Sequence, residues 1–325
     1  MRRRGFTILL SIAVALSLIP PEARPQEVGK TYRLALLALS PQSVKATRDL
    51  TLPELAKYGF VEGRNLIFDA NVADNGDLPS LAREVVFRKP DAILAISNAP
   101  IEAARQATST IPIVMMGDDP VRLGFATSLA HPGSNITGVT ILTAELDGKR
   151  LQLLHEAVPY AQRMATLHVQ GAPNRDASEQ AMRSVAASGG LELVSFDTVG
   201  ATDYPTAFVA MRKSGAQALV ITSHPQLYHD AEQLTALASK AGLPTICEWA
   251  EMARTGCVIG YGPSLREVRR RLGEYIARVF RGSSPSSLPI EGPTHFELAI
   301  NLKTTRALGI EMPQGLLLRA DEVIE

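Results

Sequence analysis

Small polar residues, with a few acidic and aromatic ones, stand directly after short apolar segments at several points in the chain. In the first half of the chain they are Ser40, Gln42, Ser97, Asn98, Ala99, Gly117, Asp118 and Asp119. In the second half they are Asn174, Ser223, His224, Glu248, Trp249 and Tyr261. Backbone N–H groups beside hydroxyls and amides hold carboxylates, acids hold ammonium groups, and indole rings stack on apolar groups. These residue types predict a binding site for a small organic molecule.

Asp118 and Asp119 come nearest to an acid–base pair. Adjacent residues at a strand end usually point apart, so we do not expect them to share a proton. We expect Asp119 to cap a helix ahead of Pro120, and Asp118 to contact a ligand ammonium group. His224 precedes Pro225 and has two interpretations, a hydrogen bond to the ligand or a structural cap.

Glu248, Trp249 and Tyr261 each have two interpretations as well. Trp249 is either a core residue or a stacking wall for an aromatic, heterocyclic or apolar ligand. Glu248 either receives a ligand ammonium group or is a solvated loop acid. Tyr261 lies between Gly260 and Gly262, and either contacts the ligand or packs a hinge.

Sequence patterns that support catalysis are missing after the apolar segments. We find no Gly-x-Ser-x-Gly elbow, no phosphate loop and no Gly-x-Gly-x-x-Gly turn there. His224 and His229 lack the carboxylate pattern that accompanies zinc sites. We therefore expect no catalytic residues, no metal and no cofactor.

Cys247 and Cys257 are the only two cysteines. They either form a disulfide, which an oxidising compartment permits, or serve as two small buried apolar residues. A run of basic residues, Arg269–Arg271, is expected on the solvated face of an amphipathic helix.

The chain has 325 residues, of which 46% are hydrophobic, enough for two lobes of roughly 120–150 residues each. Its 33 Lys and Arg residues balance 33 Asp and Glu residues. Because there is no basic excess, no nucleic-acid partner is expected.

The first residues have the pattern of a secretory signal. Three arginines follow Met1, and then an apolar run of about 15 residues leads to Pro20 and Pro21. As a helix this run would reach ~22 Å, less than the ~30 Å of a bilayer core, which disfavours a membrane anchor. No cysteine stands near it to carry a lipid. We expect residues 1–25 to be a signal peptide and the protein to be periplasmic.

From residue 31, short apolar segments alternate with amphipathic ones in two similar rounds. Strands are predicted at 32–39, 65–70, 92–96 and 113–116, and then at 163–169, 191–196, 218–222, 245–247, 258–261 and 295–301. Helices are predicted at 44–58, 78–88, 100–109, 144–157, 177–188, 204–213, 227–241, 265–280 and 303–308. This alternation predicts two doubly wound, Rossmann-like α/β lobes with buried parallel strands. Ligands of such sheets bind at the carboxyl ends of the strands, where the polar residues stand.

Several segments, in this order and spacing, carry a resemblance that covers nearly all of the chain after the signal. They are YGFVEGRNL (58–66), QATSTIPIV (106–114), DPV with Gly124 (119–124), HPGSNITG (131–138), LDGKRL (146–151), FELAINLKT (296–304) and LLRADEVIE (317–325). The chain resembles the ABC-transporter substrate-binding family that includes tryptophan- and tyrosine-type binding proteins.

The resemblance implies a type I periplasmic-binding fold, with three segments crossing between the lobes and no catalytic activity. We expect crossings near 140–145, 260–264 and 288–294. The N-terminal lobe would then comprise 31–143 with 264–290, and the C-terminal lobe 144–263 with 291–325. The expected partners are a small-molecule ligand and an ABC permease in the inner membrane, and the expected state is a monomer.

Two segments depart from the family pattern, Gly117–Asp119 and Ser97-Asn98. Both belong to the predicted cleft, so the resemblance does not identify the ligand beyond an amino acid or an aromatic or heterocyclic compound. Two other functions remain open, a ligand sensor for a membrane receptor kinase and an exported hydrolase or racemase.

Overall fold

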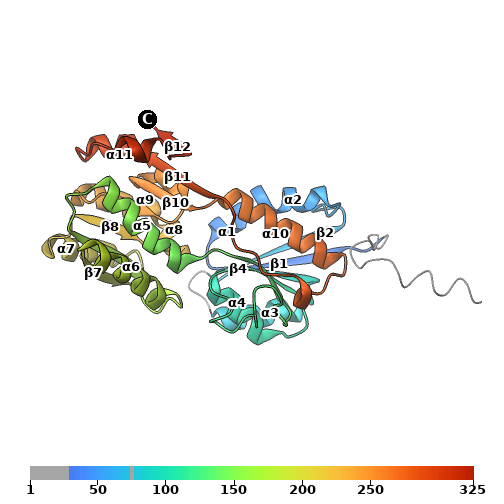
Figure 1. Cartoon of the computed structure of the whole chain (residues 1–325). Coiled ribbons are helices and arrows are strands. Elements are labelled where there is room, and N and C mark those ends of the chain that lie inside the picture. Colours follow the sequence, from blue (N-terminus) through green and yellow to red (C-terminus); the bar gives the residue numbers. More distant parts are fainter. Residues whose placement is uncertain (1–28, 74–76) are drawn as a thin grey trace, which may run out of the picture.

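Two α/β lobes, each built on one sheet, make up the computed structural model (Figure 1). The structure describes residues 29–73 and 77–325. The predicted signal peptide lies outside the described residues and remains a prediction. Within the described part of the chain, no helix is long and apolar enough to cross a membrane.

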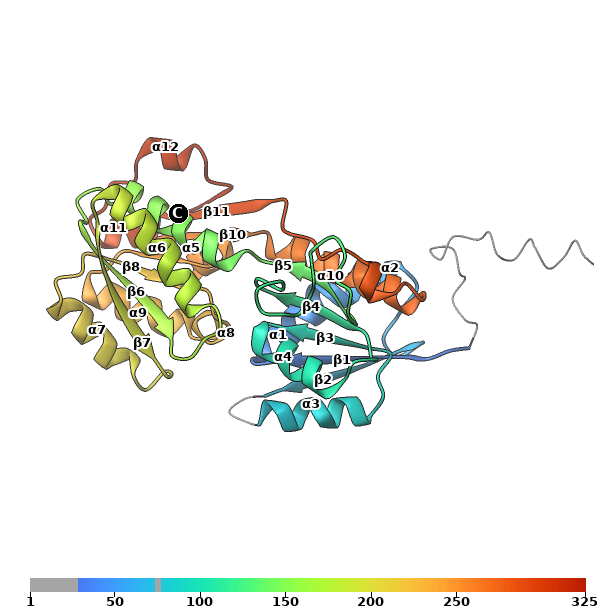
Figure 2. The same ribbon diagram turned by 60° about the horizontal axis from the view of Figure 1, so that its bottom comes forward.

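The first sheet has five parallel strands in the order β2-β1-β3-β4-β5. The strands are β1 (Tyr32–Ala38), β2 (Leu66–Val72), β3 (Ala92–Ile96), β4 (Ile113–Gly117) and β5 (Ile136–Thr140). Around them lie α1 (Pro41–Ala46), α2 (Leu52–Lys57), α3 (Leu78–Phe87), α4 (Asn98–Ala107) and α10 (Leu265–Phe280). Helices α2 and α10 cover one face and α3 and α4 the other (Figures 1 and 2).

Alternate residues of these strands face opposite layers, which is why the strands read as continuous apolar runs. Leu36 belongs to the buried cluster that contains Leu272 of α10, whereas its neighbour Leu37 belongs to the cluster that contains Ile101 of α4. Burial on both faces therefore fixes this sheet between two helical layers.

The second sheet has seven strands in the order β12-β11-β10-β9-β8-β6-β7. They are β6 (Arg163–Val169), β7 (Glu192–Thr198), β8 (Ala218–Ile221), β9 (Thr245–Cys247), β10 (Ile259–Pro263), β11 (Phe296–Asn301) and β12 (Glu322–Ile324). The helices are α5 (Thr143–Ala157), α6 (Arg175–Gly189), α7 (Tyr204–Lys213), α8 (Pro225–His229), α9 (Ala231–Ala241), α11 (Leu302–Ala307) and α12 (Gln314–Leu317). Only the β10–β11 pair is antiparallel. Strand β10 leads the chain toward the first lobe and β11 brings it back, so the two strands run in opposite directions.

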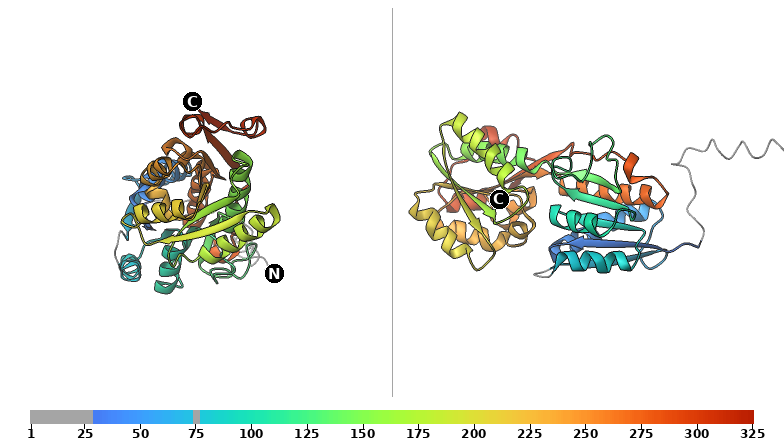
Figure 3. Two further views of the ribbon diagram at one scale, coloured as in Figure 1. Left: turned by 90° about the vertical axis from the view of Figure 1, so that its left-hand side faces the viewer. Right: turned by 90° about the horizontal axis from the view of Figure 1, so that it is seen from below.

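Three segments carry the chain between the sheets, between β5 and α5, between β10 and α10, and before β11. They lie side by side, because Thr140 N donates to Glu291 O at 2.9 Å and Ser264 N donates to His295 O at 3.0 Å. Seen from below, the lobes stand next to each other on either side of this connection (Figure 3). We keep the lobe boundaries given above, 31–143 with 264–290 and 144–263 with 291–325, as a proposal.

Two predicted helices differ from the observed ones. In place of one helix at 44–58, α1 and α2 are joined by a π-helical turn, η3 (Thr47–Thr51). Pro53 has no N–H for the regular ladder, and the wider turn accommodates this loss. The predicted helix at 227–241 begins earlier, at Pro225, and is interrupted at Asp230, whose carboxylate accepts a 2.7 Å hydrogen bond from Tyr204.

The structure also contains elements that were not predicted, namely β5, α12, β12 and two short 3-10 helices, η4 (Ala250–Thr255) and η5 (Pro285–Ser287). Strand β5 carries Thr137 and Gly138, which weaken its apolar pattern. Gly138 has φ 137° and its backbone lies against Met115, where a Cβ atom would collide with the neighbouring strand. The glycine that this close approach requires also interrupts the apolar pattern, so hydrophobicity alone does not predict the strand.

Cys247 and Cys257 form a disulfide, so the interpretation as two separate buried thiols is wrong. The bridge ties the end of β9 to the segment that enters β10, across a sequence separation of 10 residues.

We predict that replacing both residues, Cys247→Ala with Cys257→Ala, lowers the free energy of unfolding by about 2–3 kcal/mol, because the closed loop is short. Urea denaturation of the oxidised wild type and of the double variant measures the difference. Equal stabilities would contradict a structural role for the bridge.

Candidate functional site

A cavity lies between the two lobes at the carboxyl ends of the parallel strands. It holds about 840 Å³ of space, its open mouth included. Eleven of the predicted residues line it, namely Ser40, Ser97, Asn98, Ala99, Gly117, Asp118, Asn174, Ser223, His224, Glu248 and Trp249. Gln42, Asp119 and Tyr261 are not among the lining residues. Both lobes therefore contribute polar strand ends to one space, as doubly wound sheets do at their ligand sites.

Asp118 follows β4 in the first lobe and contacts the start of α5 in the second. Its side chain is 5% exposed. Oδ1 accepts a hydrogen bond from Thr143 N at 2.8 Å, and the backbone N–H of Asp118 donates to Oδ1 of Asn98 at 2.8 Å. Burial raises the pKa of Asp118 to about 6. This acid therefore exchanges its proton close to neutral pH.

The prediction that Asp119 caps a helix is wrong. The chain after Asp119 forms turns rather than a helix. Its carboxylate pairs with the side chain of Arg122 and accepts a 3.3 Å hydrogen bond from Arg122 N. Asp119 has φ 43°, a left-handed conformation that turns the chain away before a helix can start.

Glu248 is buried, with 6% of its surface exposed, so its interpretation as a solvated loop acid is wrong. Ser223 donates its hydroxyl hydrogen bond to Oε1 of Glu248. Burial raises the pKa of Glu248 to about 7. The cavity thus contains two acids, one from each lobe, that are only partly ionised near neutral pH.

Arg150, which the sequence analysis missed, fixes the backbone beneath Glu248. It is fully buried on α5 and pairs with Asp147 at 2.6 Å. Its Nε donates to the carbonyl of Tyr261 at 2.7 Å, and Nη2 donates to the carbonyl of Glu248 at 3.0 Å. Tyr261 itself stacks on Phe296, with ring centroids 6.3 Å apart, and packs the connection between the lobes.

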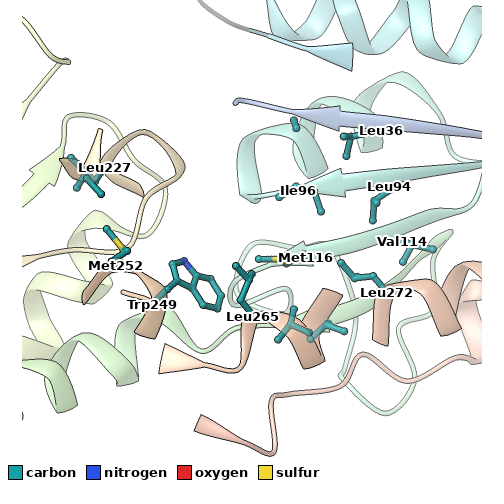
Figure 4. Close-up of a cluster of buried hydrophobic side chains, with 14 of the residues drawn as sticks. Leu36, Leu94, Ile96, Val114, Met116, Leu227, Trp249, Met252, Leu265 and Leu272 are labelled. Carbon is teal, nitrogen blue, oxygen red and sulfur yellow. The ribbon is translucent and has the colours of Figure 1, made fainter. Parts of the chain in front are cut away.

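Trp249 is a core residue, and its stacking on a ligand remains a prediction. Its side chain is buried, and it belongs to one apolar cluster with Met116 and Leu265 from the other side of the cavity (Figure 4). All three residues line the cavity. The indole is therefore a core residue that also lines the cavity.

His224 acts as a structural cap and also borders the cavity. Its Nδ1 accepts a hydrogen bond from Gln226 N at 3.1 Å, at the start of α8. Burial lowers the pKa of His224 to about 4. The imidazole is therefore neutral at physiological pH and supplies no positive charge to the cavity.

The prediction that Arg269–Arg271 lie on a solvated helix face is wrong for Arg269. Arg270 and Arg271 are partly exposed and pair with Glu54 and Glu291, but Arg269 is only 4% exposed and lines the cavity. A sequence signal for this existed, because Arg269 stands four residues after Leu265 and three before Leu272, on the apolar side of α10. Other lining residues that the sequence analysis missed include Ser43, Met116, Ile141, Thr143, Tyr228 and Leu265.

The two buried acids predict an unusual pH dependence of stability. Their raised pKa values mean that the folded protein keeps protons which the unfolded chain loses above about pH 4. Stability from these groups is present below that pH and is lost as the pH rises through about 6 and 7. The variant Glu248→Gln keeps an acceptor for Ser223 but no longer binds a proton at this position. Its free energy of unfolding should therefore fall by on the order of 2 kcal/mol less than that of the wild type between pH 5 and pH 8.

Urea denaturation at both pH values measures this difference. The exposed Glu232→Gln serves as the control and should behave as the wild type does. The same pH dependence in wild type and Glu248→Gln would contradict a proton held by Glu248.

Comparisons with known proteins agree on one family. The family model described as ABC transporter substrate binding protein matches residues 36–324. A tyrosine-binding protein of Clostridioides difficile (strain R20291) is 24% identical over 286 residues, which cover 87% of this chain and 81% of that protein.

Solved structures show the same fold. A conserved domain protein of Vibrio cholerae O1 biovar El Tor has a TM-score of 0.84 at 25% identity, covering 90% of this chain and 100% of that one. The ABC domain of Streptococcus pneumoniae in complex with L-Trp has a TM-score of 0.83 at 19% identity, covering 91% and 100%. The fold is thus the predicted type I periplasmic-binding fold. The chain belongs to the ABC transporter substrate-binding protein family.

Proposed function

We propose that this protein is the periplasmic solute-binding protein of an ABC importer, and that it binds an amino acid or an aromatic or heterocyclic compound between its lobes. The observation that supports this most is the cavity itself, whose lining comes from both lobes and from the connection between them. A ligand that contacts both sides draws them together, and the closed protein then delivers it to a permease in the inner membrane. We propose that it acts as a monomer.

The lining matches a ligand with a flat or apolar part and a polar part. Trp249, Met116 and Leu265 form an apolar wall, and the carboxamide of Asn98 lies at the polar end beside Asp118. Small-molecule sites typically combine such an apolar wall with a few placed polar groups. The names of the tyrosine-binding relative and of the tryptophan complex are consistent with a ligand of this class.

The hydrogen bonds of the cavity favour binding over catalysis. A hydrolase would use Ser223 as nucleophile and His224 as its base. Ser223, however, donates to Glu248, and Nδ1 of His224 accepts from the backbone of α8. We therefore propose that the protein is not an enzyme, and turnover of any bound compound would contradict this. A ligand sensor for a membrane receptor kinase would use the same cavity. A permease gene beside this gene would favour the importer over the sensor.

Trp249 is the chain's only tryptophan, so intrinsic fluorescence reports directly on the cavity. The protein, refolded from denaturant to remove bound compounds, is screened against amino acids, aromatic acids, nucleobases and small peptides. A ligand at 100 times its Kd adds about 2.7 kcal/mol of stability and raises the melting temperature by a few degrees. We predict that the same non-fluorescent ligand also changes the Trp249 emission.

Two variants test the contact itself. Trp249→Phe keeps a ring and Trp249→Leu does not, so an aromatic ligand should bind the leucine variant about 2- to 10-fold more weakly than the phenylalanine variant. The exposed Tyr160→Leu is the control and should not change affinity. A stabilising ligand that leaves the emission of Trp249 unchanged would place the binding site elsewhere.

A further inference from the structure

Arg269 introduces a buried positive charge at the cavity. It lies in the second turn of α10, lines the cavity and is 4% exposed. It is the only Lys or Arg among the lining residues, and the lining histidine, His224, is neutral. The charge that a ligand meets there is therefore set by this one guanidinium and by the two acids, Asp118 and Glu248.

The guanidinium of Arg269 has no acidic partner among the residues that the structure describes. Its Nη1 lies 3.4 Å from the hydroxyl of Thr47, and its buried Nε has no hydrogen-bond partner. Burial lowers the pKa of Arg269 to about 10. At neutral pH it remains charged.

A buried charge of this kind is destabilising unless it is paired. The neighbouring arginines are more exposed, and each has an acidic partner: Arg270 pairs with Glu54 and Arg271 with Glu291. Arg269 is buried without such a pair, and it lines a cavity where a ligand can supply the missing partner. Sites that bind a charged group commonly carry such an uncompensated charge in the empty protein.

We propose that Arg269 is the anion-binding group of the cavity and that the ligand is a small organic carboxylate. The planar guanidinium offers two parallel donors that match the two oxygens of a carboxylate. A phosphate dianion fits less well, because one cation would face it together with two acids. A ligand ammonium group, where present, finds its partner in Asp118 or Glu248. This inference rests on the proposed function and narrows its ligand class.

The first test compares acids with amides, in which a neutral carboxamide replaces the carboxylate, in a thermal-shift titration of the refolded protein. Suitable pairs are L-phenylalanine with L-phenylalaninamide, L-leucine with L-leucinamide, and benzoate with benzamide. We expect at least one acid to stabilise the protein and its amide to bind about 10- to 100-fold more weakly, as the loss of a charged hydrogen-bond pair requires. Stabilisation by an amide as strong as by its acid, or by a neutral nucleobase alone, would overturn the proposal.

The second test uses variants of α10. Arg269→Met should weaken binding of that acid about 10- to 100-fold, whereas Arg269→Lys, which keeps the charge, should retain part of the affinity. Arg270→Met is the matched control, since Arg270 is the next residue and points to the surface, and it should bind as the wild type does. Unchanged affinity in Arg269→Met would overturn the proposal and leave the proposed function intact.

A third readout needs no ligand. Because methionine removes an unpaired buried charge, Arg269→Met should raise the melting temperature of the ligand-free protein by about 1–3 °C. A lower melting temperature would show that Arg269 stabilises the empty protein and would contradict a role reserved for the ligand. If, in addition, no compound of any class stabilises the wild type, the proposed function fails as well.

Discussion

The buried guanidinium of Arg150 is the interaction that holds the second lobe's side of the cavity in place. It pairs with Asp147 on the same helix and donates to the backbone carbonyls of Glu248 and Tyr261. Asp147 also accepts a hydrogen bond from Ser178 of α6. One side chain thereby joins α5, the end of β9 and the strand that leaves for the first lobe. A buried pair of this kind is strongly destabilising when one partner is removed, so this arrangement is fixed.

The charged groups that line the cavity are not paired with one another in this way. Arg150 and Asp147 satisfy each other, whereas Arg269 has no acidic partner in the described chain, and Asp118 and Glu248 hold protons up to pH values near neutral. Such groups reduce the stability of the empty protein, and two well-packed sheets tolerate that loss. The contrast supports the proposed binding site, because the buried guanidinium that lacks an acidic partner in the described chain lies at the cavity.

The sequence predicted most strands, because strands buried on both faces appear as continuous apolar runs. It failed where tertiary contacts decide the structure. Strand β5 requires the close approach of Gly138 to Met115, and the break between α8 and α9 falls at Asp230, which accepts a hydrogen bond from Tyr204. At the site, the polar strand ends could be named from the order of elements alone. Arg269 was missed because it stands in a run of three arginines, although the helical repeat of α10 already placed it on the buried side.

The most direct test of the account is a crystal structure of the protein with the acid that stabilises it most. The account predicts a ligand between the lobes, its carboxylate oxygens at about 2.7–2.9 Å from the guanidinium nitrogens of Arg269, and its apolar part against Trp249. A ligand bound outside the cavity, or one whose carboxylate faces another group while the Arg269 guanidinium stays unpaired, would contradict it.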